Sequence, residues 1–155
     1  MSAPTSKAAS TFYLNLSTTD VTRASAFYTA LGLTPVKDWS DESTATFLLP
    51  PPNQTIAVML HAHKRFREFI RPDSDVVNAH KSTEALFSIT CENKETVDKW
   101  LEIVDKEGGK KDPFVLKGYG QEMELYSRSW ADLDGHIWEC VHIFAGNEET
   151  QAGKD

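Results

Sequence analysis

The sequence predicts an α+β fold of two similar modules, each running strand, helix, strand, strand, strand (βαβββ). The first observation behind this prediction is a weak repeat: the alternating strand-like segment Phe12–Ser17 has a counterpart at Leu86–Cys91, with Leu14 and Phe87 standing 73 residues apart. The second is an amphipathic helical pattern that follows each of these segments at the same offset. Two such modules packed side by side form a curved mixed sheet with the helices on its convex face.

The two helices are predicted from their caps and their apolar spacing. The first helix begins near Asp20, ends at Gly32 and carries the apolar residues Ala24, Phe27, Tyr28 and Leu31. The second helix takes Asn93 as its N-cap, ends at Gly108-Gly109 and carries Val97, Trp100, Leu101 and Val104. Each apolar set follows the i, i+3, i+4, i+7 spacing that places side chains on one helical face.

Three further strands are predicted after each helix. In the first half they cover residues 36–39, 44–49 and 55–61, with a turn at Pro50–Asn53. In the second half they cover residues 113–116, 122–130 and 136–143. A connecting segment, residues 62–82, contains a short amphipathic helix with Phe66, Phe69 and Ile70 on one face. This segment either packs on its own module, covers a cleft as a flap, or forms a dimer contact.

The chain length of 155 residues predicts one globular domain. We expect a disordered segment at residues 1–10, a single domain at 11–144 and a disordered polar tail at 145–155. Within the domain, the first module covers residues 11–61, the linker 62–82 and the second module 83–144.

Composition and charge narrow the range of partners. A formal net charge of −7 argues against nucleic acid and anionic membranes, because both require a basic surface. No apolar run approaches the ~20 residues of a membrane span, and the polar N-terminus does not resemble a secretory signal. With Cys91 and Cys140 as its two cysteines, the chain is expected to be cytoplasmic with both thiols reduced and buried.

One segment of the second half is difficult to explain by packing alone. Asp132-Leu133-Asp134-Gly135 reads as a tight turn between two strands, and Glu139 follows four residues later inside an apolar run. A carboxylate there is either solvated or held by partners in a cavity. The block resembles the F-x-D-P-D-G-x-x-x-E signature of the vicinal oxygen chelate superfamily, which includes glyoxalase I, extradiol dioxygenases and the fosfomycin- and bleomycin-resistance proteins. Phe27–Gly32 is similar to the F-Y-x-x-L-G segment of the same superfamily.

Strand alternation predicts which side chains share the face that the helices leave open. The helix-covered face receives mainly large apolar residues, which are Phe12, Leu14, Leu16, Phe87, Ile89, Trp130 and Trp138. The opposite face is mainly polar and contains Glu139, the predicted catalytic residue. It also contains the predicted substrate-binding residues Tyr13, Asn15, Met59, His61, Ser88, Ser127 and Ser129.

The resemblance implies metal ligands on the first and last strands of each module. Of the four corresponding positions, Glu139 is the one that retains a ligand, and His61 lies two residues beyond the position that falls on Met59. Leu86 occupies a third position and cannot coordinate a metal. No tightly bound cofactor is therefore expected. A divalent metal, held by Glu139 and His61, is the alternative.

Two functions fit this site. The first is a glyoxalase-like enzyme, a lyase or isomerase that transfers a proton on a small oxygenated molecule with Glu139 as general base. The second is a metal-free protein that binds and sequesters a small molecule, as in the bleomycin-resistance type. In both cases the resemblance and the apolar linker predict a homodimer. A purely structural hydrogen-bond network around Glu139 also remains open.

Overall fold

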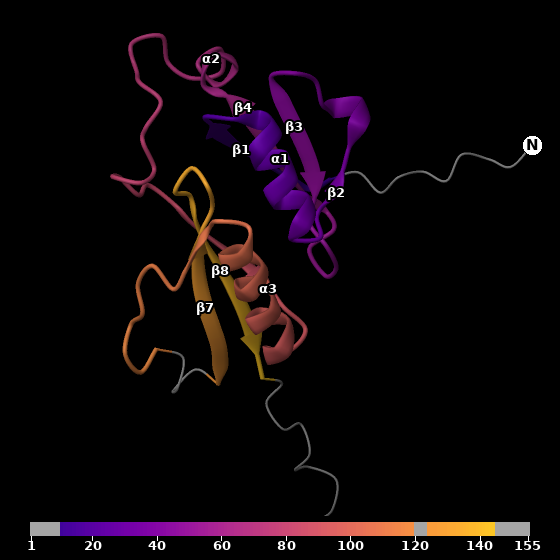
Figure 1. Cartoon of the computed structure of the whole chain (residues 1–155), viewed down its shortest axis with the longest axis vertical. Helices are drawn as coiled ribbons and strands as arrows, with labels where there is room; N and C mark the ends of the chain where they lie inside the picture. The colour runs from indigo at the N-terminus through magenta and orange to yellow at the C-terminus, as the bar shows by residue number, and fades with distance from the viewer. Residues whose placement is uncertain (1–9, 120–123, 145–155) are drawn as a thin grey trace, which may run out of the picture. The chain divides into compact units, whose positions relative to one another are not determined.

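The computed structural model describes residues 10–119 and 124–144, which fold into two βαβββ units (Figure 1). The first unit contains the chain up to Thr83 together with Leu133–Gly135, and the second contains the remainder from Glu84 onward. The disorder predicted for the two chain ends, and the strand start predicted at residue 122, lie outside the described residues. No helix of the described chain is long and apolar enough to cross a membrane.

The first unit is a four-stranded mixed sheet with one long helix. Its elements are β1 (Phe12–Thr18), α1 (Val21–Ala30), β2 (Thr34–Pro35), the 3₁₀ helix η1 (Lys37–Trp39), β3 (Thr44–Leu48), β4 (Ile56–Ala62) and the short α2 (His63–Phe66). The strand order is β1-β4-β3-β2. β1 runs parallel to β4, and the other pairs are antiparallel.

The second unit repeats this topology. Its elements are β5 (Leu86–Thr90), α3 (Lys94–Lys106), β6 (Lys110–Lys111), β7 (Leu125–Ala131) and β8 (Ile137–Ile143). The strand order is β5-β8-β7-β6, again with one parallel pair, β5 and β8. The α+β class and the two-module repeat predicted from the sequence are confirmed.

Both long helices begin as their sequences predict. The Asp20 side chain accepts a hydrogen bond from the Arg23 backbone N–H at 2.9 Å, and the Asn93 side chain accepts one from the Thr96 N–H at 2.8 Å. Each bond satisfies one of the donors that a helix N-terminus leaves without an intrahelical partner. Gly32 follows α1 with a φ of 90°, a left-handed conformation that favours glycine.

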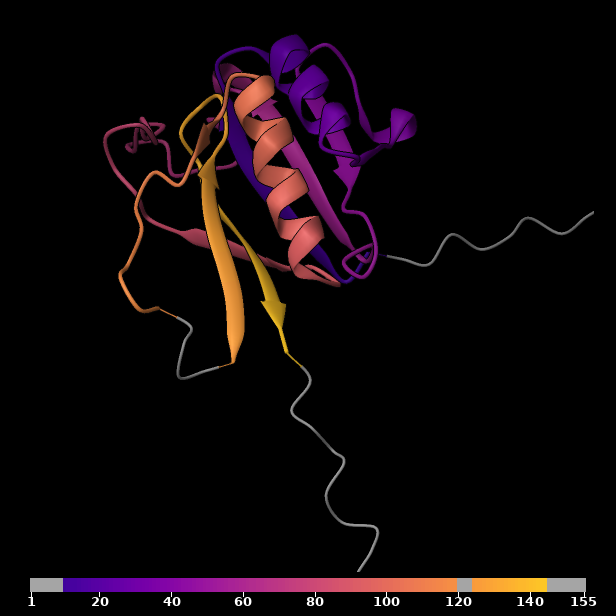
Figure 2. The same cartoon turned by 60° about the horizontal axis from the view of Figure 1, so that its bottom comes forward.

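Each helix covers one face of its own sheet, and this contact forms the core of each unit. In the first unit, Tyr28 of α1 stacks on Phe47 of β3 with ring centroids 6.1 Å apart. In the second unit, α3 lies along β7 and β8 (Figures 1 and 2), where Trp100 contacts Trp130 at 5.9 Å. Trp130 in turn stacks on Trp138 at 5.4 Å, and both indoles are buried. The predicted apolar faces are largely confirmed, with Phe12 the exception because its side chain is 56% exposed.

Two predicted strands are wrong. The predicted strand over residues 36–39 is replaced by η1 (Lys37–Trp39), and the preceding strand β2 is limited to Thr34–Pro35. Residues 113–116 are irregular, and the corresponding strand β6 lies earlier, at Lys110–Lys111. A proline has no N–H to donate to a strand ladder, so Pro35 and Pro113 both limit pairing where they occur. Cys91 and Cys140 are buried free thiols, as predicted.

The turn formed by Asp132–Gly135 has a structural role. The Asp134 carboxylate belongs to the first unit and accepts three hydrogen bonds at the end of β1: from the Thr18 hydroxyl at 2.6 Å, the Thr19 N–H at 2.8 Å and the Thr19 hydroxyl at 2.7 Å. Gly135 has a φ of 93°, and a Cβ placed on it would lie 2.5 Å from the backbone nitrogen of His80. The hydrogen bonds of Asp134 and the need for glycine at position 135 are therefore both explained by contacts within the first unit.

Replacing Asp134 with alanine is expected to lower the free energy of unfolding by about 1–3 kcal/mol, because three donors at the end of β1 lose their acceptor. Urea unfolding followed by circular dichroism measures the change. Asp73→Ala removes an equal charge from an exposed site and serves as the control. Equal stabilities for the two variants would contradict the assigned role.

Candidate functional site

Glu139 lies in the middle of β8, on the face of the second sheet opposite α3. Its carboxylate is half-buried and accepts a hydrogen bond on each oxygen: Oε2 from the Ser88 hydroxyl at 2.6 Å and Oε1 from the Ser127 hydroxyl. Ser88 is directly opposite Glu139 on β5, and Ser127 comes from β7 on the other side. Three of the predicted site residues therefore meet in one cluster, which we call the Glu139 cluster.

The remaining predicted serine is engaged elsewhere. Ser129 is the direct partner of Glu139 in the β7–β8 ladder, but its hydroxyl donates to the backbone oxygen of Phe114 at 3.2 Å. This bond ties the start of the loop between β6 and β7 to the strand that carries Ser127. Phe114 is 74% exposed, so the loop presents apolar surface near this face of the sheet.

Apolar side chains surround the Glu139 cluster on the same sheet face. Strand alternation places Ile137 and Val141 beside Glu139, and both are half-buried. Leu86, two residues before Ser88, is 55% exposed. The face therefore combines one carboxylate and several hydroxyls with an apolar surround, a mixture typical of small-molecule sites.

A second polar cluster lies on the open face of the first unit. His61 of β4 is buried at 2% exposure, with Nδ1 2.8 Å from the Thr44 hydroxyl and Nε2 2.9 Å from the Asn15 side-chain oxygen. Burial lowers the pKa of His61, and the positive charge of Arg65 lowers it further, while Asp41 acts in the opposite direction. We call this group the His61 cluster; it contains two of the predicted residues, Asn15 and His61.

The cover over His61 was not expected from the sequence. The ring of Phe69 lies 5.1 Å from the imidazole and that of Phe66 lies 6.3 Å away. The Arg65 guanidinium in turn lies 4.8 Å from the centre of the Phe69 ring. Of the three roles considered for residues 62–82, this geometry favours packing on their own module. The spacing of Phe66 and Phe69 predicts a short helix, but it does not indicate that these rings pack on His61.

The two other predicted residues of the first unit contribute no side chain to the His61 cluster, although the Tyr13 backbone oxygen accepts a hydrogen bond from the Asn15 amide nitrogen at 3.4 Å. Tyr13 is 47% exposed, and its ring lies 6.0 Å from that of Trp39. Met59 is half-buried and pairs with Asn15 in the β1–β4 ladder. Because Asn15 and Ser88 are 73 residues apart, Met59 occupies the position that Glu139 holds in the second unit. The repeat therefore carries a carboxylate in one copy and a thioether in the other.

The residues that the structure describes do not provide the donor set of a protein-held catalytic metal. Such a site needs about three nitrogen, oxygen or sulfur ligands at short range. Within the described chain no group of three or more His, Cys, Asp or Glu side chains is arranged to hold an ion. Leu86, which occupies a position where the family resemblance implies a ligand, has no donor atom, and both ring nitrogens of His61 are engaged by Thr44 and Asn15.

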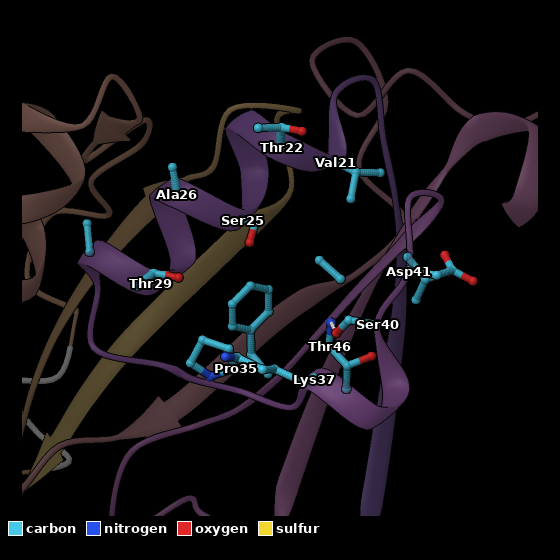
Figure 3. Close-up of a pocket in the computed structure, with 14 residues that line it drawn as sticks. Val21, Thr22, Ser25, Ala26, Thr29, Pro35, Lys37, Ser40, Asp41 and Thr46 are labelled. Atoms are coloured by element: carbon cyan, nitrogen blue, oxygen red, sulfur yellow. Dashed lines mark hydrogen bonds between the residues drawn. The ribbon is translucent and has the colours of Figure 1, made fainter.

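A separate groove opens on the helix side of the first sheet. It has a volume of about 760 Å³ and lies between α1 and β3 (Figure 3). Ser25 and Thr29 of α1 face Lys37 and Ser40 across it. No sequence motif indicates this groove, because its lining residues, all between Val21 and Phe47, come from several elements and share no regular spacing. Its lining includes Phe47, which stacks on Tyr28 of α1, and also Thr44, whose hydroxyl bonds His61.

Comparison with solved structures shows the same fold in other proteins. A protein described as hypothetical protein SA1046 from S. aureus is 23% identical with a TM-score of 0.64, and the match covers 84% of this chain and 91% of that one. A glyoxalase/bleomycin resistance protein/dioxygenase family enzyme from Burkholderia phytofirmans PsJN is 16% identical with a TM-score of 0.68, covering 85% and 97%. The fosfomycin resistance protein FosX from Listeria monocytogenes, complexed with Mn(II) and sulfate, is 16% identical with a TM-score of 0.57, covering 85% and 86%.

No curated protein matches the sequence significantly. The model of one family, however, matches residues 11–140, which is most of the chain and includes both units and the Glu139 cluster. The match agrees with the repeated βαβββ topology and with the Asp-x-Asp-Gly turn followed by Glu139. The chain belongs to the Glyoxalase/Bleomycin resistance protein/Dioxygenase superfamily.

Proposed function

We propose that the protein is a small-molecule enzyme in which Glu139 transfers a proton on a small oxygenated substrate, as a lyase or isomerase does. The supporting observation is the pair of hydroxyl donors, Ser88 and Ser127, that hold one oxygen each of the Glu139 carboxylate. These bonds fix the position of the base, which is the part of general-base catalysis that a protein must supply.

The hydrogen bonds from Ser88 and Ser127 leave the Glu139 carboxylate able to act as a base. Each carboxylate oxygen has two lone-pair positions, so an oxygen that accepts from a serine still has one position for an incoming proton. In the proposed step, Glu139 removes a proton from the carbon next to a substrate carbonyl. The electron pair of the broken C–H bond forms a C=C bond, and the carbonyl π pair moves to the oxygen, which gives an enolate. In a 2-hydroxycarbonyl substrate, Glu139 then returns the proton to the former carbonyl carbon while the hydroxyl proton passes to the enolate oxygen. The product is the isomeric hydroxycarbonyl compound, so atoms and charge balance.

The second candidate function is binding without reaction. The exposed Leu86 and the half-buried Ile137 and Val141 favour it, because they give the Glu139 cluster an apolar surround that can hold the body of a ligand. A binding protein would use Glu139 as a fixed acceptor for a hydroxyl or cationic group. The two functions differ in whether the ligand exchanges a carbon-bound proton with solvent.

Glu139→Gln tests the proposed reaction, because it keeps the shape of the side chain but removes the base. A panel of small 2-hydroxycarbonyl compounds and thiohemiacetals is incubated with the protein in D₂O, and exchange of the α-proton is followed by NMR. Activity should fall roughly 10²-fold or more in Glu139→Gln, with little change in thermal stability. Glu102→Gln, on an exposed position of α3, is the matched control.

Three other outcomes have clear meanings. A stability loss of about 1–3 kcal/mol, with ligand binding falling in parallel, would assign Glu139 a structural role only. Binding of a panel member without proton exchange in the wild-type protein would favour the binding function. An unchanged exchange rate in Glu139→Gln would overturn the proposed base.

We further propose that the protein works without a tightly held metal, as the poor donor set suggests. Metal analysis of the purified protein should give well under one transition-metal ion per chain. Prolonged treatment with EDTA should leave the melting temperature and the proton-exchange rate unchanged. A stoichiometric metal that resists chelation and is lost in Glu139→Gln would contradict this proposal.

The protein is also proposed to form a homodimer through the linker that follows α2. Phe69 is 57% exposed even though its ring contacts His61, so part of its surface remains open for a second copy. Light scattering at tens of micromolar should give twice the chain mass of 17.4 kDa. Phe69→Asp should lower that mass, whereas Val77→Asp, an exposed position of the same linker, should not. A wild-type monomer would rule the dimer out.

A further inference from the structure

The hydrogen bonds of the His61 cluster specify where the imidazole carries its proton. The Asn15 amide oxygen can only accept, and it lies 2.9 Å from Nε2 of His61, so Nε2 must carry the hydrogen. In the neutral ring Nδ1 is then an acceptor, and the Thr44 hydroxyl donates to it at 2.8 Å. The orientation of the Asn15 amide is supported by its nitrogen, which donates to the Tyr13 carbonyl oxygen at 3.4 Å.

The surroundings of His61 keep the ring neutral. Phe66 and Phe69 cover it, and its exposure is 2%. Burial lowers its pKa because the charged form loses contact with water. The charged groups that act on it are Arg65, which opposes protonation, and Asp41, which has a weaker opposite effect. A neutral ring with a fixed tautomer holds the Asn15 oxygen in one direction.

The ring itself cannot reach a ligand, whereas Asn15 can. Both nitrogens of His61 are engaged and its side chain is buried, but Asn15 is exposed on the open face of the first sheet. A primary amide carries two N–H donors on its nitrogen. This nitrogen donates to the Tyr13 backbone oxygen at 3.4 Å, which is at the long limit for a hydrogen bond.

We propose that His61 is a positioning residue, which holds the Asn15 amide by its oxygen so that the amide nitrogen is presented outward as a fixed donor for a carbonyl or carboxylate oxygen of a ligand. The inference rests on the proposed function only in that both assume a small oxygenated ligand. It concerns the first unit alone and requires no action of Glu139. The second unit has Val141 of β8 at the position that His61 occupies in β4. The proposal therefore also gives a reason for a buried, neutral histidine in the first unit.

The expected contribution of the fixed Asn15 donor to ligand binding is small but measurable. Fixing a side-chain amide in advance removes the entropy cost of ordering it when a ligand arrives. One neutral hydrogen bond contributes on the order of 1 kcal/mol, so losing the fixed donor should weaken binding of an oxygen acceptor roughly three- to tenfold.

Nitrogen NMR on the full-length protein tests the proposal. In the wild type, the His61 ring should show a protonated Nε2 and an unprotonated Nδ1 at neutral pH. The Asn15 side-chain NH₂ signals, assigned by their loss in Asn15→Asp, should shift on titration with acetamide or acetate. A response to acetamide alone selects a neutral carbonyl ligand, and a stronger response to acetate selects a carboxylate.

Two variants separate positioning from a general structural effect. His61→Leu should weaken the acetamide or acetate response of Asn15 roughly three- to tenfold. His61→Gln, whose amide N–H can still donate to the Asn15 oxygen, should restore most of it. Repeating the titration in Glu139→Gln should give the wild-type response, which distinguishes failure of this inference from failure of the proposed reaction.

Three results would overturn the inference. One is a wild-type His61 protonated on Nδ1, which can be measured even if His61→Leu does not fold. Another is the absence of any Asn15 response to both probes in the wild type. The third is an equal response in the wild type and His61→Leu.

Discussion

The arrangement of the polar residues depends on covering one face of each sheet with a helix. Successive side chains of a strand point to opposite faces, so burying Phe47 under α1 and Trp130 under α3 leaves the alternate residues on the other face. Every polar group of the two clusters lies on such an alternate position. The Trp130–Trp138 stack fixes the strand register in the second unit, because a slip by one residue would exchange Glu139 for an indole.

The family motif combines two functions that the sequence alone does not separate. Its turn is structural, since Asp132 accepts from the His136 N–H at 2.9 Å and Asp134 accepts from Thr18 and Thr19. Its glutamate is on β8, away from the turn, and bonds to two serines from neighbouring strands. A variant in the turn should therefore act through stability, whereas a variant of Glu139 should act through chemistry or binding.

The elements with a long periodic pattern could be predicted from the sequence, and the short ones could not. β1, β5, α1 and α3 follow from alternation, helical spacing and the caps Asp20 and Asn93. β2 and β6 have two residues each, and they form only because β3 and β7 lie beside them. No local sequence pattern reveals such a pairing. In the site, the shared location of Ser88, Ser127 and Glu139 could be predicted by assigning alternate strand residues to one sheet face. The burial of His61 could not, because it depends on Phe69, which follows β4 in an irregular segment and packs on the ring.

We propose the Glu139 cluster as the place where a small molecule binds. A crystal structure of the protein as isolated, at a resolution that separates ligand atoms from water, is the decisive measurement. Electron density for an organic molecule is expected within hydrogen-bond distance of a Glu139 oxygen, with Ser88 and Ser127 still bonded to the carboxylate. Density for an organic molecule elsewhere, such as the groove beside α1, with the Glu139 carboxylate turned toward solvent, would contradict it.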